Sequence, residues 1–285
     1  KKEDNEQYFS QATTSFSLNN VNLDIQPGEL VMVVGLVGCG KSSFLSALLN
    51  DMPKTTGTIA VRGKTSIVQQ NAWITNNTLR SNVVFGEKFD RDRYNDVIAG
   101  CSLTEDLKQF QGGDKIVIGE RGINLSGGQK TRVGLARACY SHSDIVCLDC
   151  PLAAVDSHVA DHIFNECIMK FLSKRTRIFA TNQIQRLEHA DKIVVLRNGT
   201  VVACGSWEEI QRDHSDALEL LGRQEDTTNE ADQAMENEKQ MELQMEVGMM
   251  TGMMTADQLE EDNAGGDGDG VNSLTLRLRS NSTGS

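Results

Sequence analysis

A glycine-rich turn joins an apolar run to a helical run near the start of this chain. Gly35-Leu36-Val37-Gly38-Cys39-Gly40-Lys41-Ser42 follows the pattern G-x-x-x-x-G-K-S, with apolar Leu30–Val34 before it and a helix expected over Ser43–Asn50 after it. Glycines let the chain curl so that successive backbone N–H groups face one point, and a helix amino terminus adds positive potential there. The pattern therefore predicts a loop that holds phosphate groups.

The side chains in and after this turn suit a nucleoside triphosphate with Mg²⁺. Lys41 is expected to reach the β- and γ-phosphates, and the Ser42 hydroxyl is expected to bind Mg²⁺. A further acidic residue is needed at the end of another strand, and Asp149 supplies it after the apolar run Ile145–Leu148. We expect Asp149 to hold Mg²⁺ through water. The residues assigned to phosphate binding are Gly35, Gly38, Cys39, Gly40, Lys41, Ser42 and Ser43.

The distribution of charge divides the chain and excludes some partners. The 285 residues carry a formal net charge of −12, and 14 acidic against 4 basic residues in 222–285 account for most of it. The remaining part is close to neutral, so nothing favours binding to a nucleic-acid backbone. The acidic end has too few large apolar residues to form a core and is predicted to be a disordered linker or regulatory tail. No apolar run is long enough to cross a membrane, and no signal peptide opens the chain.

Between these ends, strand-like and helix-like segments alternate. This order predicts an α/β fold with a mostly parallel sheet, an antiparallel part and a helical part. Asn198-Gly199 between two apolar runs predicts a hairpin. Strands are expected at Glu29–Gly35, Thr58–Arg62, Thr65–Gln69, Asp144–Asp149, Thr176–Thr181, Lys192–Leu196 and Val201–Cys204. Helices are expected at Lys41–Leu49, Arg91–Ile98, Gly127–Tyr140, His158–Leu172 and Trp207–Arg212.

A second anion cradle, Leu125-Ser126-Gly127-Gly128-Gln129, opens the helix that runs through Arg137. It lies about 90 residues after the first cradle, too far along the chain to share one phosphate locally. With these two cradles in place, the sequence resembles the ATP-binding domain of ATP-binding cassette (ABC) transporters. Val68–Trp73 is similar to the family's Q-loop, and Ala153–Asp156 is similar to its D-loop.

The stretches Gly122–Lys130 and Pro151–Val159 are most similar to the first nucleotide-binding domain of subfamily C, the multidrug-resistance-associated type. The resemblance implies a P-loop NTPase core, domain limits of 17–221 with a helical subdomain at about 71–125, and a linker or partial first strand at 1–16. It implies ATP and Mg²⁺ as ligands, with Gln70 as a further Mg²⁺ and γ-phosphate contact. It also implies a head-to-tail partner domain whose ATP would meet Leu125–Gln129 and the D-loop Asp156, membrane-spanning domains, and a place on the cytoplasmic face of a membrane.

Two residues depart from the pattern of an active member of this family. Cys150 stands where active members carry a Glu that polarises the attacking water, and Asn182 stands where they carry a histidine. A thiol with an ordinary pKa of about 8.5 is a weak acceptor at pH 7. The resemblance therefore implies a site that binds Mg-ATP but hydrolyses it slowly. The adenine-stacking aromatic of the family is expected at Tyr8, with Phe9 as the alternative.

Three other functions remain open on the sequence alone. A non-transport member could gate or regulate a channel, and the two substitutions fit it equally well. A soluble ABC ATPase without a membrane partner is disfavoured, since the chain lacks a basic surface. An ATPase acting alone is disfavoured by Cys150 and Asn182. For the transporter, the resemblance implies export of organic anions or conjugates.

The seven cysteines are Cys39, Cys101, Cys139, Cys147, Cys150, Cys167 and Cys204. Cys147 and Cys150 form a CxxC pair, but no second pair or suitably placed histidine completes a metal set. We interpret all seven as small reduced thiols, mostly buried.

Overall fold

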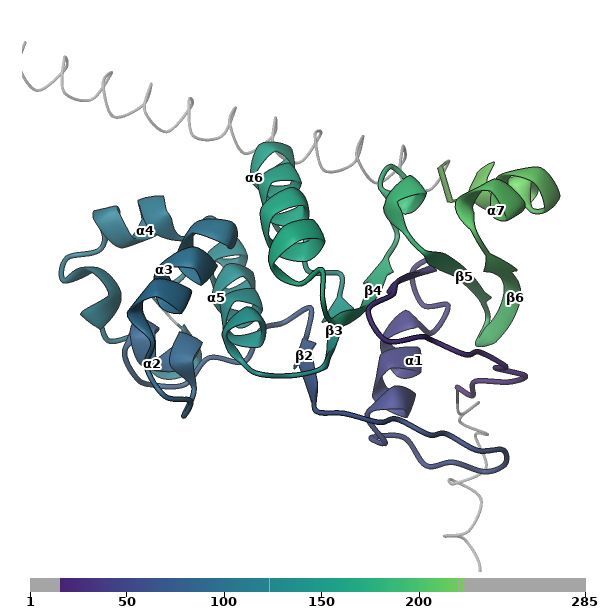
Figure 1. Ribbon diagram of the computed structural model, residues 1–285, viewed down its shortest axis with the longest axis horizontal. Helices are drawn as coiled ribbons and strands as arrows, with labels where there is room; N and C mark the ends of the chain where they lie inside the picture. The colour runs from purple at the N-terminus through teal and green to yellow at the C-terminus, as the bar shows by residue number, and fades with distance from the viewer. Residues whose placement is uncertain (1–15, 123, 220, 223–285) are drawn as a thin grey trace, which may run out of the picture. The chain divides into compact units, whose positions relative to one another are not determined.

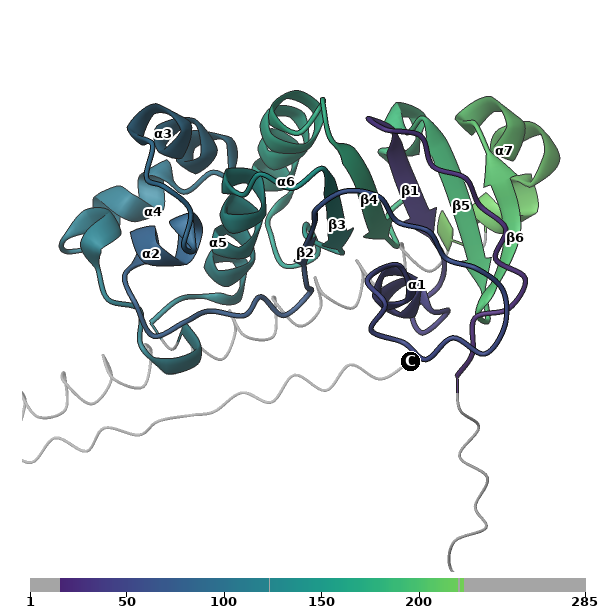
Figure 2. The same ribbon diagram turned by 60° about the horizontal axis from the view of Figure 1, so that its bottom comes forward.

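The computed structural model describes residues 16–122, 124–219 and 221–222. These residues form a six-stranded sheet in the order β2-β3-β4-β1-β5-β6. Figure 1 labels every strand except β1, which Figure 2 labels between β4 and β5. The five strands from β2 to β5 in that order run parallel, and β6 pairs antiparallel with β5. The strands are β1 Leu30–Val34, β2 Thr65–Val68, β3 Ile145–Asp149, β4 Thr176–Thr181, β5 Lys192–Arg197 and β6 Thr200–Gly205. The predicted α/β class with a mostly parallel sheet is confirmed.

Side chains of β1 enter two separate cores, one on each face of the sheet. Leu30, Met32 and Val34 belong to the larger core, whereas Val31 and Val33 belong to the smaller one. All five are at most 1% exposed. A parallel strand covered on both faces is expected to be apolar throughout, since successive side chains alternate between two buried sides. The continuous apolar run in the sequence is the direct result.

Helices cover both faces and extend beyond one edge of the sheet. The helix α1 packs against β3 and β4 on the side of the smaller core. Figure 2 shows α2, α3 and α4 grouped beside the β2 edge, with α7 next to β6. The α-helices are α1 Lys41–Leu48, α2 Leu79–Val84, α3 Arg91–Gly100, α4 Thr104–Gln109, α5 Gly127–Tyr140, α6 Ser157–His162 and α7 Trp207–Asp213. A π-helix, η3 Ile163–Phe171, continues α6, and short 3₁₀ turns lie at η1 Gly113–Lys115, η2 Glu120–Gly122 and η4 Leu187–His189.

One expected strand is absent from the structure, and two short helices were not predicted. The strand expected at Thr58–Arg62 is wrong: this segment has no strand geometry, and Ile59 and Val61 are 46% and 40% exposed. Within the described residues no neighbouring strand pairs with it, and an unpaired strand leaves its backbone groups without partners. The helix expected at His158–Leu172 is present as α6 continued by the π-helix η3, whereas α2 and α4 are short helices that the sequence pattern did not predict.

The hairpin turn matches its prediction. Asn198 and Gly199 connect β5 to β6 with φ values of 49° and 75°. Positive φ at both central residues is the requirement of the tight hairpin turn that Asn-Gly favours. The turn also reaches the phosphate loop, because the Gly199 N–H donates to the Cys39 carbonyl at 2.8 Å. The predicted hairpin is therefore confirmed.

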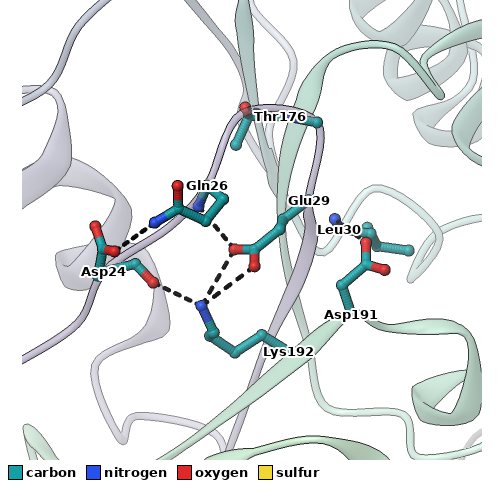
Figure 3. A network of polar contacts seen from close by, with 8 residues as sticks. Asp24, Gln26, Glu29, Leu30, Thr176, Asp191 and Lys192 are labelled. Atoms are coloured by element: carbon teal, nitrogen blue, oxygen red, sulfur yellow. Dashed lines mark hydrogen bonds and ion pairs between the residues drawn. The ribbon is translucent and has the colours of Figure 1, made fainter.

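A polar network fixes the amino ends of the central strands. The Lys192 ammonium donates to the Glu29 carboxylate at 3.2 Å and to the Asp24 carbonyl at 2.6 Å. The Leu30 N–H donates to the Asp191 carboxylate at 2.7 Å. These contacts join the start of β1 to the start of β5. They therefore fix the register of the two strands, and with it the positions at which both strands end. Figure 3 shows this network, formed by Asp24, Gln26, Glu29, Leu30, Thr176, Asp191 and Lys192.

Candidate functional site

The turn between β1 and α1 closes in a conformation that only glycines allow. A Cβ on Gly35 would lie 2.3 Å from the Leu196 carbonyl oxygen and 2.4 Å from the Cys39 sulfur. Gly40 has a φ of 111°, which strains any side chain. Gly38 has a φ of 80°, with nothing within 4 Å of an added Cβ, so this part of the turn is open. The curled turn predicted from the sequence is therefore present, with one glycine needed for close packing and two for backbone conformation.

The helix that follows leaves its amino terminus free for an anion. Gly40 precedes α1 without a side chain to cap it, and the first turn of α1 carries no acidic residue. The buried Lys41 ammonium folds over the loop and donates to the carbonyls of Gly35 at 2.7 Å and Leu36 at 3.1 Å. Ser42, next in the chain, is exposed. Uncapped N–H groups, the helix dipole and a lysine directed at the same point suit a phosphate chain.

Asp149 ends β3 at the same edge of the sheet from which this loop leaves. It pairs with Ala180 in β4, and the adjacent Thr181 pairs with Val34, the residue before the loop. Asp149 is 8% exposed, and its Oδ1 atom has no hydrogen-bond partner. A buried carboxylate oxygen without a partner is costly unless an ion or water satisfies it. The orphaned oxygen therefore fits a water-coordinated Mg²⁺, and the Ser42 hydroxyl, after the loop that leaves β1 two strands away, would supply a second oxygen.

Cys150 follows Asp149 in a left-handed turn. Its φ is 47°, and its N–H donates to the Ala180 carbonyl at 3.0 Å. Burial, and then the negative charge of Asp149, raise the pKa of the Cys150 thiol to about 11, against an opposing effect of the Lys41 ammonium. The influence of Lys41 places this thiol within electrostatic range of the phosphate loop. At pH 7 a thiol with this pKa is ionised in about one molecule in 10⁴.

Gln70 and Asn182 also lie past the carboxyl ends of strands. Gln70 is exposed two residues after β2, and the partly buried Asn182 directly follows Thr181 of β4. The Gln183 N–H donates to the Thr181 hydroxyl at 3.0 Å, which turns the chain just after Asn182. In parallel sheets ligands bind along this edge. The structure thus gathers the phosphate loop, Asp149, Cys150, Gln70 and Asn182 at one edge.

The second cradle is built around the start of α5. Ser126 caps the helix by accepting from the Gln129 N–H at 3.2 Å, and the Gln129 side-chain oxygen accepts from the Ser126 N–H at 2.9 Å. The Gln129 side-chain amide donates at 2.9 Å to the buried carboxylate of Asp106 in α4. Leu125 is buried, whereas Ser126 and Gly127 are exposed. The cradle is therefore held by its own polar contacts and presents two residues outward.

The turn after Cys150 approaches this cradle. A Cβ on Gly128 would lie 2.8 Å from the Ala154 carbonyl oxygen, so only glycine fits there. Asp156, expected in the D-loop, accepts from the Val159 N–H at 3.0 Å and caps α6. The two motifs that the sequence places apart thus meet at Gly128 and Ala154.

The two cradles lie beside strands that are three strand spacings apart in the sheet. The helix α5 packs against β2, whereas the phosphate loop follows β1, and β3 and β4 lie between these strands. Three steps between neighbouring strands of about 4.8 Å each amount to about 14 Å. The exposed residues of the second cradle therefore cannot bind the phosphate held by the first cradle of the same chain.

The aromatic residue that the structure places near the phosphate loop differs from the one expected to stack on adenine. Tyr8 and Phe9 lie outside the described residues. A Cβ on Gly40 would lie 2.3 Å from the Phe16 ring, so this ring covers the phosphate loop. The Phe16 ring is 43% exposed. Sequence reasoning missed it, although it is the aromatic residue closest along the chain to Leu18.

These features define a P-loop NTPase: a glycine-rich loop and lysine between a strand and a helix, with an aspartate ending a second parallel strand. The family model for the ABC transporter matches residues 18–153. This segment is an ABC transporter ATP-binding domain, of the subfamily C type. The sequence-based recognition of that family is confirmed, whereas the choice of the first of its two nucleotide-binding domains is not tested.

Several relatives support this assignment. ATP-binding cassette sub-family C member 2 of Mus musculus is 48% identical over 210 residues, covering 71% of this chain and 14% of the relative. ABC transporter C family member 12 of Dictyostelium discoideum is 47% identical over 196 residues, covering 69% and 15%. ATP-binding cassette sub-family C member 4 of Homo sapiens is 42% identical over 214 residues, covering 75% and 16%. The chain thus spans about a seventh of the length of these relatives. Among the described residues, no helix has the length and apolarity to cross a membrane.

Proposed function

We propose that this chain is the ATP-binding part of a membrane transporter, and that its site binds Mg-ATP but hydrolyses it slowly. The phosphates would lie on the N–H groups of the loop between β1 and α1, next to the Lys41 ammonium. Ser42, Gln70 and Asp149 would hold Mg²⁺, the last through water, where the ion neutralises phosphate charge. The uncapped helix terminus and the orphaned Asp149 oxygen support this arrangement. Phe16 is the proposed adenine contact, in place of Tyr8.

Slow hydrolysis rests on two side chains, Cys150 and Asn182. With a pKa of about 11, the Cys150 thiol stays protonated at neutral pH and cannot take a proton from an attacking water. An amide at Asn182 can donate to a phosphate oxygen but cannot acquire charge. The loss of such groups typically lowers a rate by about 10²–10⁴-fold. Binding of Mg-ATP depends instead on the phosphate loop, Lys41, Ser42 and Asp149, and is therefore expected to persist.

The second cradle would serve a partner. Ser126 and Gly127 are exposed and lie too far from the chain's own loop, which supports a head-to-tail arrangement with a second nucleotide-binding domain. In that arrangement Leu125–Gln129 would contact the partner's ATP, with Asp156 beside it. Membrane-spanning domains of the same transporter would receive the resulting movement, with this domain at the cytoplasmic face. Residues 17–221 would form the domain, 1–16 a linker or partial first strand, and 222–285 an acidic linker or regulatory tail.

The identity of the cargo is the least constrained part of this proposal. Export of organic anions or conjugates is supported by the resemblance to subfamily C and by no residue of this chain, because folds do not fix substrates. The cargo would meet membrane-spanning segments, not the residues described. Flux of candidate anions into vesicles containing the full-length protein would test it, and an ATP-dependent ion current without flux would favour a channel.

The hydrolysis proposal is tested by asking which nucleotide stays bound. The chain is incubated with labelled Mg-ATP, freed from unbound nucleotide and analysed after an hour, in parallel with a Cys150→Glu/Asn182→His variant and a Lys41→Ala control. We expect intact ATP on the parent, ADP on the double variant and neither on the control. ADP on the parent at the rate of the double variant would contradict the proposal, since Cys150 and Asn182 would then not limit the reaction.

A further inference from the structure

Three cysteines that are far apart in the sequence meet in the interior. Cys101 caps the carboxyl end of α3, Cys139 lies near the end of α5, and Cys167 lies in the π-helix η3. The Cys139 and Cys167 sulfurs are 3.1 Å apart, and those of Cys101 and Cys167 are 3.9 Å apart. The three residues are at most 1% exposed. Among the described residues, they form the only group of three or more potential metal ligands close enough to share an ion.

The chemistry of this group restricts the ion that it could hold. All three ligand atoms lie within 4.8 Å of one another, and no histidine or carboxylate joins them among the described residues. Hard cations such as Mg²⁺ and Ca²⁺ take oxygen ligands, and Zn²⁺ in structural sites is almost always bound by four. Three thiolates without a fourth ligand suit a soft cation that accepts low coordination, and thiolates select Cu(I).

Two guanidinium groups compensate the charge that such a site would carry. Arg93 and Arg175 each donate to the Cys139 carbonyl, at 3.1 Å and 3.2 Å. Neither forms an ion pair with a carboxylate in the part of the chain that the structure describes. Three thiolates with Cu(I) carry a net charge of −2, which two guanidinium groups balance. A buried charge is tolerated when it is paired in this way.

We propose that Cys101, Cys139 and Cys167 form a buried, three-coordinate site for a soft thiophilic cation, with Cu(I) as its ligand. Binding replaces three S–H bonds with three Cu–S bonds and releases three protons to solvent. Copper enters and stays as Cu(I), so no electrons are exchanged. Because the three ligands come from α3, α5 and η3, the ion ties the helices beside the β2 edge to the helix after β3. The bound state is therefore expected to unfold at a higher temperature.

The proposal is tested on the full chain, reduced and free of oxygen. Cu(I) is supplied as its acetonitrile complex in competition with bicinchoninate, and the bound ion is examined by X-ray absorption. We expect one tightly bound Cu(I) per chain with three sulfur neighbours. Cys101→Ser, Cys139→Ser and Cys167→Ser are each expected to weaken binding by more than about 100-fold, beyond the effect of outer-shell changes. Cys147→Ser, a buried thiol outside the group, and Cys204→Ser, an exposed one, serve as controls.

Several results would overturn the proposal. Two or fewer sulfur neighbours in the unaltered chain would show a different site, and this measurement needs no variant to fold. Equal weakening by Cys147→Ser or Cys204→Ser would assign the copper elsewhere. A chain that fails to compete with bicinchoninate, or that forms a Cys139–Cys167 disulfide on mild oxidation while binding no copper, would show that these thiols only pack or cross-link. Circular dichroism of each variant establishes that it is folded before its affinity is compared.

Discussion

The buried ion pair beneath the second cradle offers the sharpest test of how that cradle is held. The Arg132 guanidinium donates to the Asp106 carboxylate at 2.7 Å, and the two side chains are only 14% and 11% exposed. The second carboxylate oxygen accepts from the Gln129 amide. The Arg132 Nε atom already lacks a partner. Asp106→Asn keeps the shape but leaves the guanidinium without its counter-charge.

The loss of stability expected for Asp106→Asn follows from leaving the buried Arg132 guanidinium without its counter-charge. Removing one partner of a buried pair costs about 3–5 kcal/mol. We expect the lower end, about 3 kcal/mol, because the Asn oxygen can still accept one hydrogen bond. For a domain of this size that lowers the melting temperature by roughly 6–12 °C. Replacing both members by apolar residues, in Asp106→Leu/Arg132→Met, is expected to bring the free energy of unfolding back to within about 1–2 kcal/mol of the parent.

Urea denaturation and thermal melting followed by circular dichroism measure these differences. Asp213→Asn is the matched control, since it breaks a pair with Arg212 whose side chains are 70% and 51% exposed. That change is expected to leave stability unaltered. The reasoning would be refuted by a loss below about 1 kcal/mol in Asp106→Asn, or by a double variant as unstable as the sum of its single changes.

Two further predictions concern the second cradle and Cys150. Gly128→Ala is expected to weaken ATP-dependent association with a partner domain in sedimentation experiments, since its Cβ would overlap the Ala154 carbonyl oxygen. Gly100→Ala, outside the cradle and with no atom closer than 4.0 Å to the added Cβ, is the control. Alkylation of Cys150, followed by mass spectrometry, is expected to rise with pH to a midpoint near 11. Because this pKa is raised in the folded state, stability is full below the ordinary thiol pKa of about 8.5 and falls as pH rises toward 11. A midpoint near 8.5 would contradict the burial argument.

Local patterns predicted most of the sheet because they depend on residues that are close in sequence. The strand Thr176–Thr181 and the helix Gly127–Tyr140 have the predicted bounds, since apolar runs and caps are encoded locally. The expected strand at Thr58–Arg62 failed because pairing depends on a distant neighbour that the pattern cannot show. The short helix Thr104–Gln109 has too few residues for a periodic signal.

The candidate site likewise contains some residues that the sequence predicted and some contacts that it did not. Lys41 was predicted from a contiguous motif, and Asp149 from its position at the end of an apolar run. Both residues lie at the predicted edge of the sheet. The approach of Gly128 to Ala154 and the meeting of Cys139 with Cys167 are contacts between distant segments. Spacing along the chain carries no signal for such contacts, and the pairing of α5 with η3 appears only once the helices are packed.

The structural separation of the two cradles makes their functions separable in experiment. The phosphate loop rests on β1 and the contacts of Leu196 and Cys39, whereas the second cradle rests on Asp106 and Gln129 beside β2. Changes at sites more than about 7–10 Å apart with no shared partner usually add in free energy. Cys150→Glu should therefore alter hydrolysis of the chain's own ATP alone, whereas Asp106→Asn should alter the site that a partner completes. A combined variant that departs from additivity would mean that the two sites are coupled, either through the proposed dimer or through the close approach of Gly128 to Ala154 in the turn that follows Cys150.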